Sequence, residues 1–121
     1  MRILVTGSRE WTDWRLLHKV LEEITKGIYA CEITLVHGAC LSGADALAGD
    51  LARCAGWTEE CHPADWDLHG KAAGFIRNQE MTDLGADICV AFFKTGAGNK
   101  GTGHCAARAE AAGIPVRRVE G

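Results

Sequence analysis

Four short segments of the chain combine glycines with side chains that can hold an anion. The first is TGSREW, in which Gly7 permits a tight turn while Ser8 and Arg9 supply a hydroxyl group and a guanidinium. Donors of this kind suit a phosphate or a carboxylate. A simple turn with a solvated Arg9 is the alternative interpretation.

The second segment is VHGACLSGADALA, where Gly38 and Gly43 flank a loop that runs directly into a helix of small residues. A helix start lined by glycines offers free N–H groups and a positive dipole end to an anion. Ser42 and Asp45 have the S-x-x-D spacing of a capping box, so Asp45 either caps this helix or binds a ribose hydroxyl. His37 is either a structural hydrogen-bonding partner or a catalytic residue.

The third segment, HPADWDLHGKAAGFIRNQEM, carries Arg77 and Asn78 among apolar neighbours within an expected helix. A charged arginine in such surroundings needs a partner, which is either a buried acid or a bound anion. Earlier in the segment Trp66 follows Asp65, and its flat ring either stacks on a base or packs against the protein.

The fourth segment, GNKGTGHCAARAE, follows an apolar strand. Gly101 and Thr102 begin a helix whose first N–H groups are unpaired, and Lys100 adds positive charge. Gly96, Gly98 and Gly101 have the GxGxxG spacing of a dinucleotide site, but that motif belongs after the first strand and this one follows the fourth. The segment therefore predicts an anion site and no dinucleotide cofactor.

The elements that position these segments alternate along the chain. Longer stretches with helical periodicity separate five short apolar or β-branched stretches, at 2–6, 33–36, 58–62, 87–93 and 114–119. The expected helices cover residues 14–28, 44–55, about 71–84 and 102–112. This order predicts an α/β fold with three layers, a five-stranded mostly parallel sheet with helices on both faces. Ligands of such sheets bind beyond the carboxyl ends of the strands, where the four segments lie.

Composition limits the class of protein. The 121 residues suffice for one domain, residues 1–121, and 47% of them are hydrophobic. The net charge of -3 argues against nucleic acid as a partner, although a local basic pocket is compatible with it. No leader-like or membrane-spanning stretch is present, so we expect a cytoplasmic protein without a membrane partner.

The cysteines form no pair or cluster with the spacing of a metal site, so we expect no metal. Their small and apolar neighbours predict buried free thiols rather than disulfides, at positions 31, 40, 54, 61, 89 and 105. Small-residue helices in a minimal domain predict a homo-oligomer. Trp11 and Trp14 are candidates for its contact surface and equally for the core.

The stretches TGSREW, HGACLSGADALA, PADW, GFIRNQEM and KGTGHCAARAEAAGIPV together resemble the SLOG superfamily. These Rossmann-like domains include the DNA-processing protein A (Smf) and LONELY GUY families, and the nearest resemblance is to small stand-alone bacterial and phage members. The similarity covers nearly the whole chain. It implies a Rossmann-like fold with a site for a nucleotide or nucleotide-derived molecule. The ligand residues carried over are Gly7, Ser8, Arg9, Gly38, Gly43, Asp45, Arg77, Asn78, Gly101 and Thr102.

One departure from the resemblance concerns catalysis. LONELY GUY phosphoribohydrolases carry a glutamate three residues after the threonine of GTxxE, and Cys105 stands at that position here. Two functions therefore stay open. The first is a module that senses or sequesters a nucleotide-derived ligand. The second is a nucleotide hydrolase, such as a nucleoside-monophosphate glycosidase, in which Asp45, Asp65 or Glu80 replaces the missing glutamate.

Overall fold

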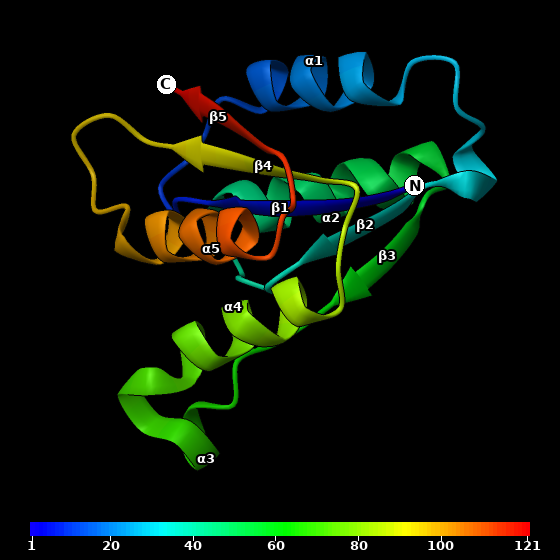
Figure 1. The fold of residues 1–121 in the computed structure, drawn as a ribbon. Helices are drawn as coiled ribbons and strands as arrows, with labels where there is room; N and C mark the ends of the chain where they lie inside the picture. Colours follow the sequence, from blue (N-terminus) through cyan, green and yellow to red (C-terminus); the bar gives the residue numbers. More distant parts are fainter.

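The computed structural model describes all 121 residues, and its centre is a five-stranded sheet with the strand order β3-β2-β1-β4-β5 (Figure 1). All four neighbouring strand pairs are parallel, so the sheet is parallel throughout. The order reverses direction at β1, which has β2 on one side and β4 on the other. The strands are β1 (Arg2–Gly7), β2 (Thr34–His37), β3 (Thr58–Cys61), β4 (Ile88–Phe93) and β5 (Val116–Glu120).

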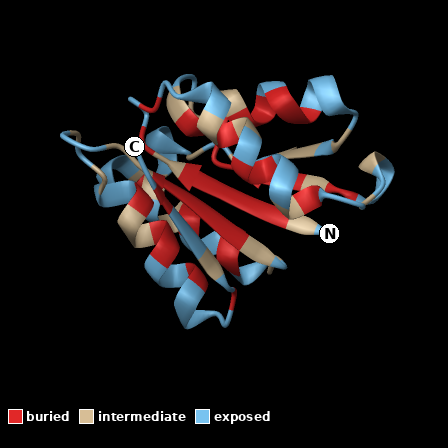
Figure 2. Cartoon of the chain, turned by 90° about the horizontal axis from the view of Figure 1, so that it is seen from above, coloured by how far each residue is buried: buried red, intermediate tan, exposed pale blue.

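Helices cover both faces of the sheet, which confirms the predicted three-layer α/β fold. One face packs against α1 (Trp14–Thr25) and α2 (Gly43–Ala55), and the other packs against α4 (Ala73–Asp83) and α5 (Lys100–Ala111). Figure 2 shows the buried residues along the central strands and on the helix sides that face them. The short helical turns are η1 (Ala30–Glu32), α3 (Trp66–His69) and η2 (Gly70–Ala72).

Alternation along the strands divides the core into two clusters. Ile3 and Val5 of β1 belong to the cluster beneath α1 and α2, and Leu4 between them belongs to the cluster beneath α4 and α5. Alanines make up much of the inner face of α2, and Ala44 and Ala48 are fully buried. Side chains this small let the helix lie close to the strands, so its first turn reaches the end of β1.

The structure differs from the sequence-based expectations in the aromatic residues near α1. Trp11 is buried against Phe92 of β4, with ring centroids 5.2 Å apart, so it belongs to the core and is closed to an oligomer contact. Trp14 is 49% exposed and lies off the core face of its helix. Ile28 lies beyond the end of α1, since the chain turns at Gly27 with a φ of 81°.

Two further expectations need correction. Residues 66–72 form the short turns α3 and η2, so the third long helix begins at Ala73 rather than near residue 71. All six cysteines are free thiols, but only Cys89 and Cys105 are buried. Cys31, Cys54 and Cys61 are exposed because they lie in a turn, on the outer side of a helix and on an edge strand. None of the helices has both the length and the apolar character needed to cross a bilayer.

A bidentate ion pair connects strands that are not neighbours. Arg2 at the start of β1 donates to both carboxylate oxygens of Glu60 on β3, at 2.9 and 2.8 Å, and its Nε donates to the carbonyl oxygen of Gly85. Hydrogen bonds from Arg2, and then from His62, lower the pKa of Glu60 to about 2. The pair therefore joins the edge strand β3 to the turn that precedes β4.

We predict that this pair makes stability depend on pH. The folded-state pKa of Glu60 lies below its ordinary value of 4.5, so the stabilisation is complete above about pH 4.5 and is lost as the pH falls toward 2. In Glu60→Gln the charge is absent, so the variant should be less stable at pH 7, by about 1 kcal/mol for a partly exposed pair. The difference should shrink at pH 2.5. Thermal unfolding at both pH values measures it, and an unchanged difference would contradict the assignment.

Candidate functional site

A cavity of about 430 Å³ opens at the carboxyl ends of the strands, beside the point where the strand order reverses. The loop after β1 contributes Ser8 and Arg9, and the loop after β2 contributes Gly38 and Cys40. The first turn of α5 and one side of α4 complete the wall. Parallel α/β sheets offer their ligand sites at this reversal, because loops from neighbouring strands leave in opposite directions there.

Most of the candidates named from the sequence line this one cavity. They are Gly7, Ser8, Arg9, Gly38, Asp45, Arg77, Asn78, Gly101 and Thr102. His37, Gly43 and Lys100 do not line it. Sequence reasoning missed several other lining residues, namely Glu10, Cys40, Lys71, Gly74, Phe75 and Met81. Helical spacing could have found two of them, because Gly74 and Met81 lie one turn before and after Arg77 and Asn78.

The first turn of α5 presents unpaired amide groups to the cavity. Asn99 occupies the N-cap position, but its side chain closes the preceding loop by accepting from the Lys94 amide at 3.0 Å and donating to carbonyl oxygens of Lys94 and Ala97. No side chain therefore caps the helix. The N–H groups of Gly101 and Thr102 have no hydrogen-bond acceptor in the protein. Amides of this kind at a helix start suit an anion.

Arg77 is held in the cavity wall by neutral groups. Its Nη1 donates to the carbonyl oxygen of Gly38 at 2.5 Å and to that of His62 at 3.4 Å, and its Nε donates to Oδ1 of Asn78 at 2.9 Å. Asn78 in turn donates to the carbonyl oxygen of Gly101. Arg77 forms no salt bridge, and its Nη2 has no partner in the protein. Asp45 is a buried acid of the same cavity whose charge interacts with that of Arg77, but no carboxylate forms an ion pair with the guanidinium.

Asp45 lies at the first turn of α2 and is 5% exposed. Its Oδ2 accepts from the N–H groups of Gly38 and Cys40, at 3.2 and 3.4 Å, which folds the loop after β2 back onto the helix. Burial raises the pKa of this carboxyl group. The predicted capping box is wrong, because Ser42 donates its hydroxyl to the carbonyl oxygen of Arg9 and no side chain caps α2.

Gly43 supports the site by its lack of a side chain. It has a φ of 76°, and a Cβ at this position would lie 2.2 Å from the carbonyl oxygen of Ser8. A Cβ at Gly7 would lie 2.4 Å from that of Ala44. The two glycines therefore let the start of α2 contact the loop after β1, where the amide of Ala44 donates to the carbonyl oxygen of Ser8.

Comparison with known proteins agrees with this architecture. Residues 1–69 match the model of the family described as YAcAr: YspA, cpYpsA-related SLOG family. The chain belongs to this family. It is also 44% identical to the gene 61 protein of Mycobacterium phage D29 over 121 residues, covering 95% of this chain and 93% of that protein. No solved structure matches. Membership of the YAcAr family supports a nucleotide-related role at a general level.

The position that carries a glutamate in phosphoribohydrolases lies away from the cavity in this YAcAr protein. Cys105 is fully buried in the cluster between α5 and the sheet and does not line the cavity. Asp65 caps α3 by accepting from the Leu68 amide, and Glu80 is exposed outside the cavity. Asp45 is thus the one member of the three suggested replacements that lines the cavity, and Glu10 is the other carboxylate there.

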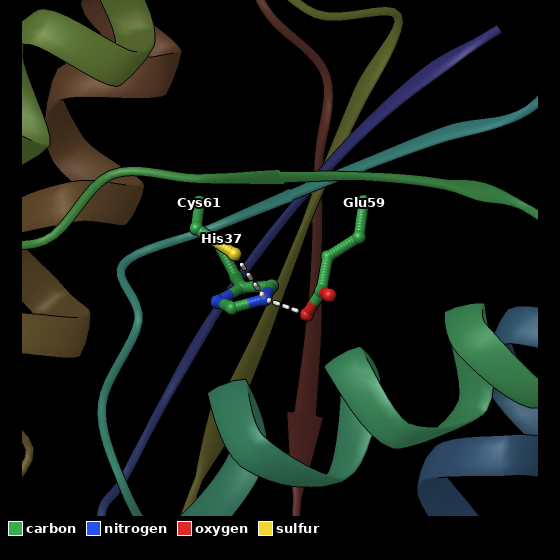
Figure 3. A group of neighbouring side chains, drawn as sticks. All are labelled: His37, Glu59 and Cys61. Carbon is green, nitrogen blue, oxygen red and sulfur yellow. Dashed lines mark hydrogen bonds and ion pairs between the residues drawn. The ribbon is translucent and has the colours of Figure 1, made fainter.

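A second group of reactive side chains lies on the α2 side of the sheet. His37, Glu59 and Cys61 come from the two neighbouring strands β2 and β3, and their ligand-type atoms lie within 4.8 Å of one another (Figure 3). Sequence spacing did not reveal the group, because parallel pairing brings His37 beside Cys61 across 24 residues. Arg53 of α2 also contacts Glu59, at 2.6 Å.

Hydrogen bonding gives this group a structural role. Nδ1 of His37 accepts from the amide of Ala39 at 2.9 Å, so the ring proton lies on Nε2, which donates to Glu59 at 2.7 Å. In this tautomer Nε2 has no lone pair for a metal. It is also the atom nearest Cys61, at 3.5 Å, so no Cys-His-acid relay forms. Of the two interpretations of His37, the structure supports the hydrogen-bonding one, which positions the loop after β2.

We predict that Gly43→Ala destabilises the YAcAr protein more than Gly56→Ala does. Gly43 begins α2 and Gly56 is its C-cap residue, and both have a φ of 76°, but a Cβ at Gly56 meets no atom within 4 Å. The Gly56 variant should lose about 1 kcal/mol for its backbone conformation. The Gly43 variant should lose a further 1 kcal/mol or more, on the order expected for overpacking. Urea unfolding measures both, and equal losses would show that the contact with Ser8 contributes nothing.

Proposed function

We propose that the protein binds a nucleotide or nucleotide-derived molecule through its phosphate groups, as a sensor or sequestering module. The observation that carries this proposal is the state of Arg77. Its guanidinium lies in the cavity wall, anchored by carbonyl oxygens, without a carboxylate partner and with Nη2 unpaired. A partly buried cation of this kind is stabilised when an anion reaches it.

The charge balance of the cavity supports an anionic ligand. Three cationic side chains line it, Arg9, Lys71 and Arg77, against the two carboxylates Glu10 and Asp45. The chain as a whole carries a net charge of -3, so this local excess is opposite to the overall charge. Arg9 is exposed, and its guanidinium forms no hydrogen bond or ion pair within the protein, which leaves its donors for a ligand.

The polar groups suit the two ends of a nucleotide's sugar phosphate. The amides of Gly101 and Thr102 at the start of α5 are donors for phosphate oxygens. Asp45 uses Oδ2 for the loop amides, and its carboxyl group also meets the thiol of Cys40. Its Oδ1 accepts from no backbone group, so a ribose hydroxyl can donate to it. The same wall thus contains donors for an anion and an acceptor for a sugar.

We predict that nucleotides stabilise the protein against heat and that Arg77→Ala removes this effect. A ligand at 100 times its dissociation constant adds about 2.7 kcal/mol to the free energy of unfolding. A thermal-shift panel of the ribonucleoside mono-, di- and triphosphates measures the stabilisation. Arg117→Ala is the matched control, since Arg117 forms an exposed ion pair with Glu23 away from the cavity and its loss should leave the shift unchanged.

A second variant keeps this test decisive if Arg77→Ala unfolds. The side chain of Arg9 forms no hydrogen bond or ion pair within the protein, so Arg9→Ala should retain the wild-type melting temperature and still weaken the nucleotide-induced shift. Absence of any shift in the wild-type protein across the panel, or an unchanged shift in both variants, would contradict the proposal.

A nucleotide hydrolase is the second candidate function, and the position of Asp45 favours it. This carboxyl group lines the cavity and its pKa is raised by burial, as in many general acids. We predict that if the wild-type protein releases free base from a nucleoside monophosphate, Asp45→Asn lowers the rate about 100-fold or more while nucleotide binding persists. Glu10→Gln is the matched control, and chromatography measures the base. No release by the wild-type protein would exclude this glycosidase activity.

A further inference from the structure

We infer that Trp66 is the stacking surface of the cavity, so that its ligand carries a planar base next to the phosphate groups. The inference rests on the proposed function and narrows it from phosphorylated compounds in general to those with an aromatic ring. The sequence alone was compatible with two roles for Trp66, stacking on a base or packing against the protein, and the inference selects the first.

Trp66 lies where two hollows meet. It lines the 430 Å³ cavity and also a neighbouring hollow of about 320 Å³. Both hollows share Arg9, Gly38, Cys40, Trp66 and Arg77. The indole is 51% exposed, although tryptophan is among the side chains that gain most from burial. Packing within the protein therefore leaves about half of Trp66 exposed, and Trp66 lines both hollows.

The ring also lies near the cationic group of the site. A Cβ placed on Gly74 of α4 would be 3.5 Å from Cη2 of Trp66 and 3.9 Å from Nη2 of Arg77. Both atoms therefore lie within 4 Å of one point beside the backbone of α4. A single small molecule can therefore contact the indole and the unpaired guanidinium nitrogen together, as a nucleotide does with its base and its phosphate.

The other aromatic ring of the cavity is already engaged. Phe75 stacks on His104, with centroids 4.2 Å apart and an angle of 26° between the rings, and the ammonium group of Lys100 lies 5.8 Å from its centroid. Trp66 has no ring or cation against its face. Its backbone is fixed, because Asp65 caps α3 and the Gly70 amide donates to the carbonyl oxygen of Trp66. A free aromatic face on a fixed backbone is a stacking platform for any base.

The experiment compares ligands with and without a base. Isothermal titration calorimetry measures the affinities of the four ribonucleoside 5′-monophosphates and diphosphates, and of ribose 5-phosphate and pyrophosphate. Trp66→Ala should weaken the nucleotides about tenfold or more and leave the two ring-free compounds unchanged. Trp66→Phe should restore most of the nucleotide affinity. Trp14→Ala is the matched control, because Trp14 is 49% exposed on α1, outside both hollows.

The other possible results distinguish an error in the stacking role of Trp66 from an error in the proposed function. Equal weakening of nucleotides and ring-free compounds by Trp66→Ala would show that the indole only supports the wall. Unchanged nucleotide affinity in that variant would show that the base lies elsewhere. Either result contradicts the stacking role of Trp66 but not the proposal that the protein binds phosphate groups. A wild-type protein that binds none of these compounds would refute the proposed function itself and the stacking with it. If Trp66→Ala unfolds, the phenylalanine variant and a Trp66→Leu variant make the same comparison.

Discussion

The hydrogen bond from Arg77 to the carbonyl oxygen of Gly38 is the interaction on which the site depends. It fixes a guanidinium in the cavity wall with a neutral acceptor, so the charge is positioned without an ion pair to a carboxylate. A carboxylate in place of that carbonyl would satisfy the cation within the protein and leave little for a ligand to gain. The fold instead keeps a guanidinium that forms no ion pair within the protein, which is the basis of the proposed anion binding.

Several polar contacts hold the carbonyl of Gly38 where Arg77 needs it. Asp45 accepts from the amides of the loop after β2, and His37 accepts from the amide of Ala39 within the same loop. Glu59 on the edge strand fixes the ring of His37. The group that resembles a metal centre by residue type, His37, Glu59 and Cys61, therefore supports the loop after β2 and does not line the cavity itself. The glycine contacts between α2 and the loop after β1 support the opposite wall in the same way.

Binding and hydrolysis differ in what they require of this wall. Binding needs donors and a positive charge, and the start of α5, Arg9 and Arg77 supply both. Hydrolysis of a glycosidic bond needs, in addition, a carboxyl group beside the sugar. Cys105 is buried beneath α5, so the position used by related phosphoribohydrolases supplies none. Asp45 lines the cavity, but its carboxylate already accepts hydrogen bonds from two loop amides. The same group therefore also has a structural role.

The sequence by itself determined the fold class, because local periodicities of two and 3.6 residues specify strands and helices. Strands and helices that alternate along the chain can pack in only a few arrangements. It also placed most of the segments that line the cavity, since chain order alone puts the loops after parallel strands at one edge of the sheet. Only the tertiary structure decided which partner each polar side chain has. Arg77 meets Gly38 across 39 residues, and Asp45 turns from its helix to the preceding loop. Such choices depend on the distances that packing sets between segments, and no local pattern of residues encodes those distances.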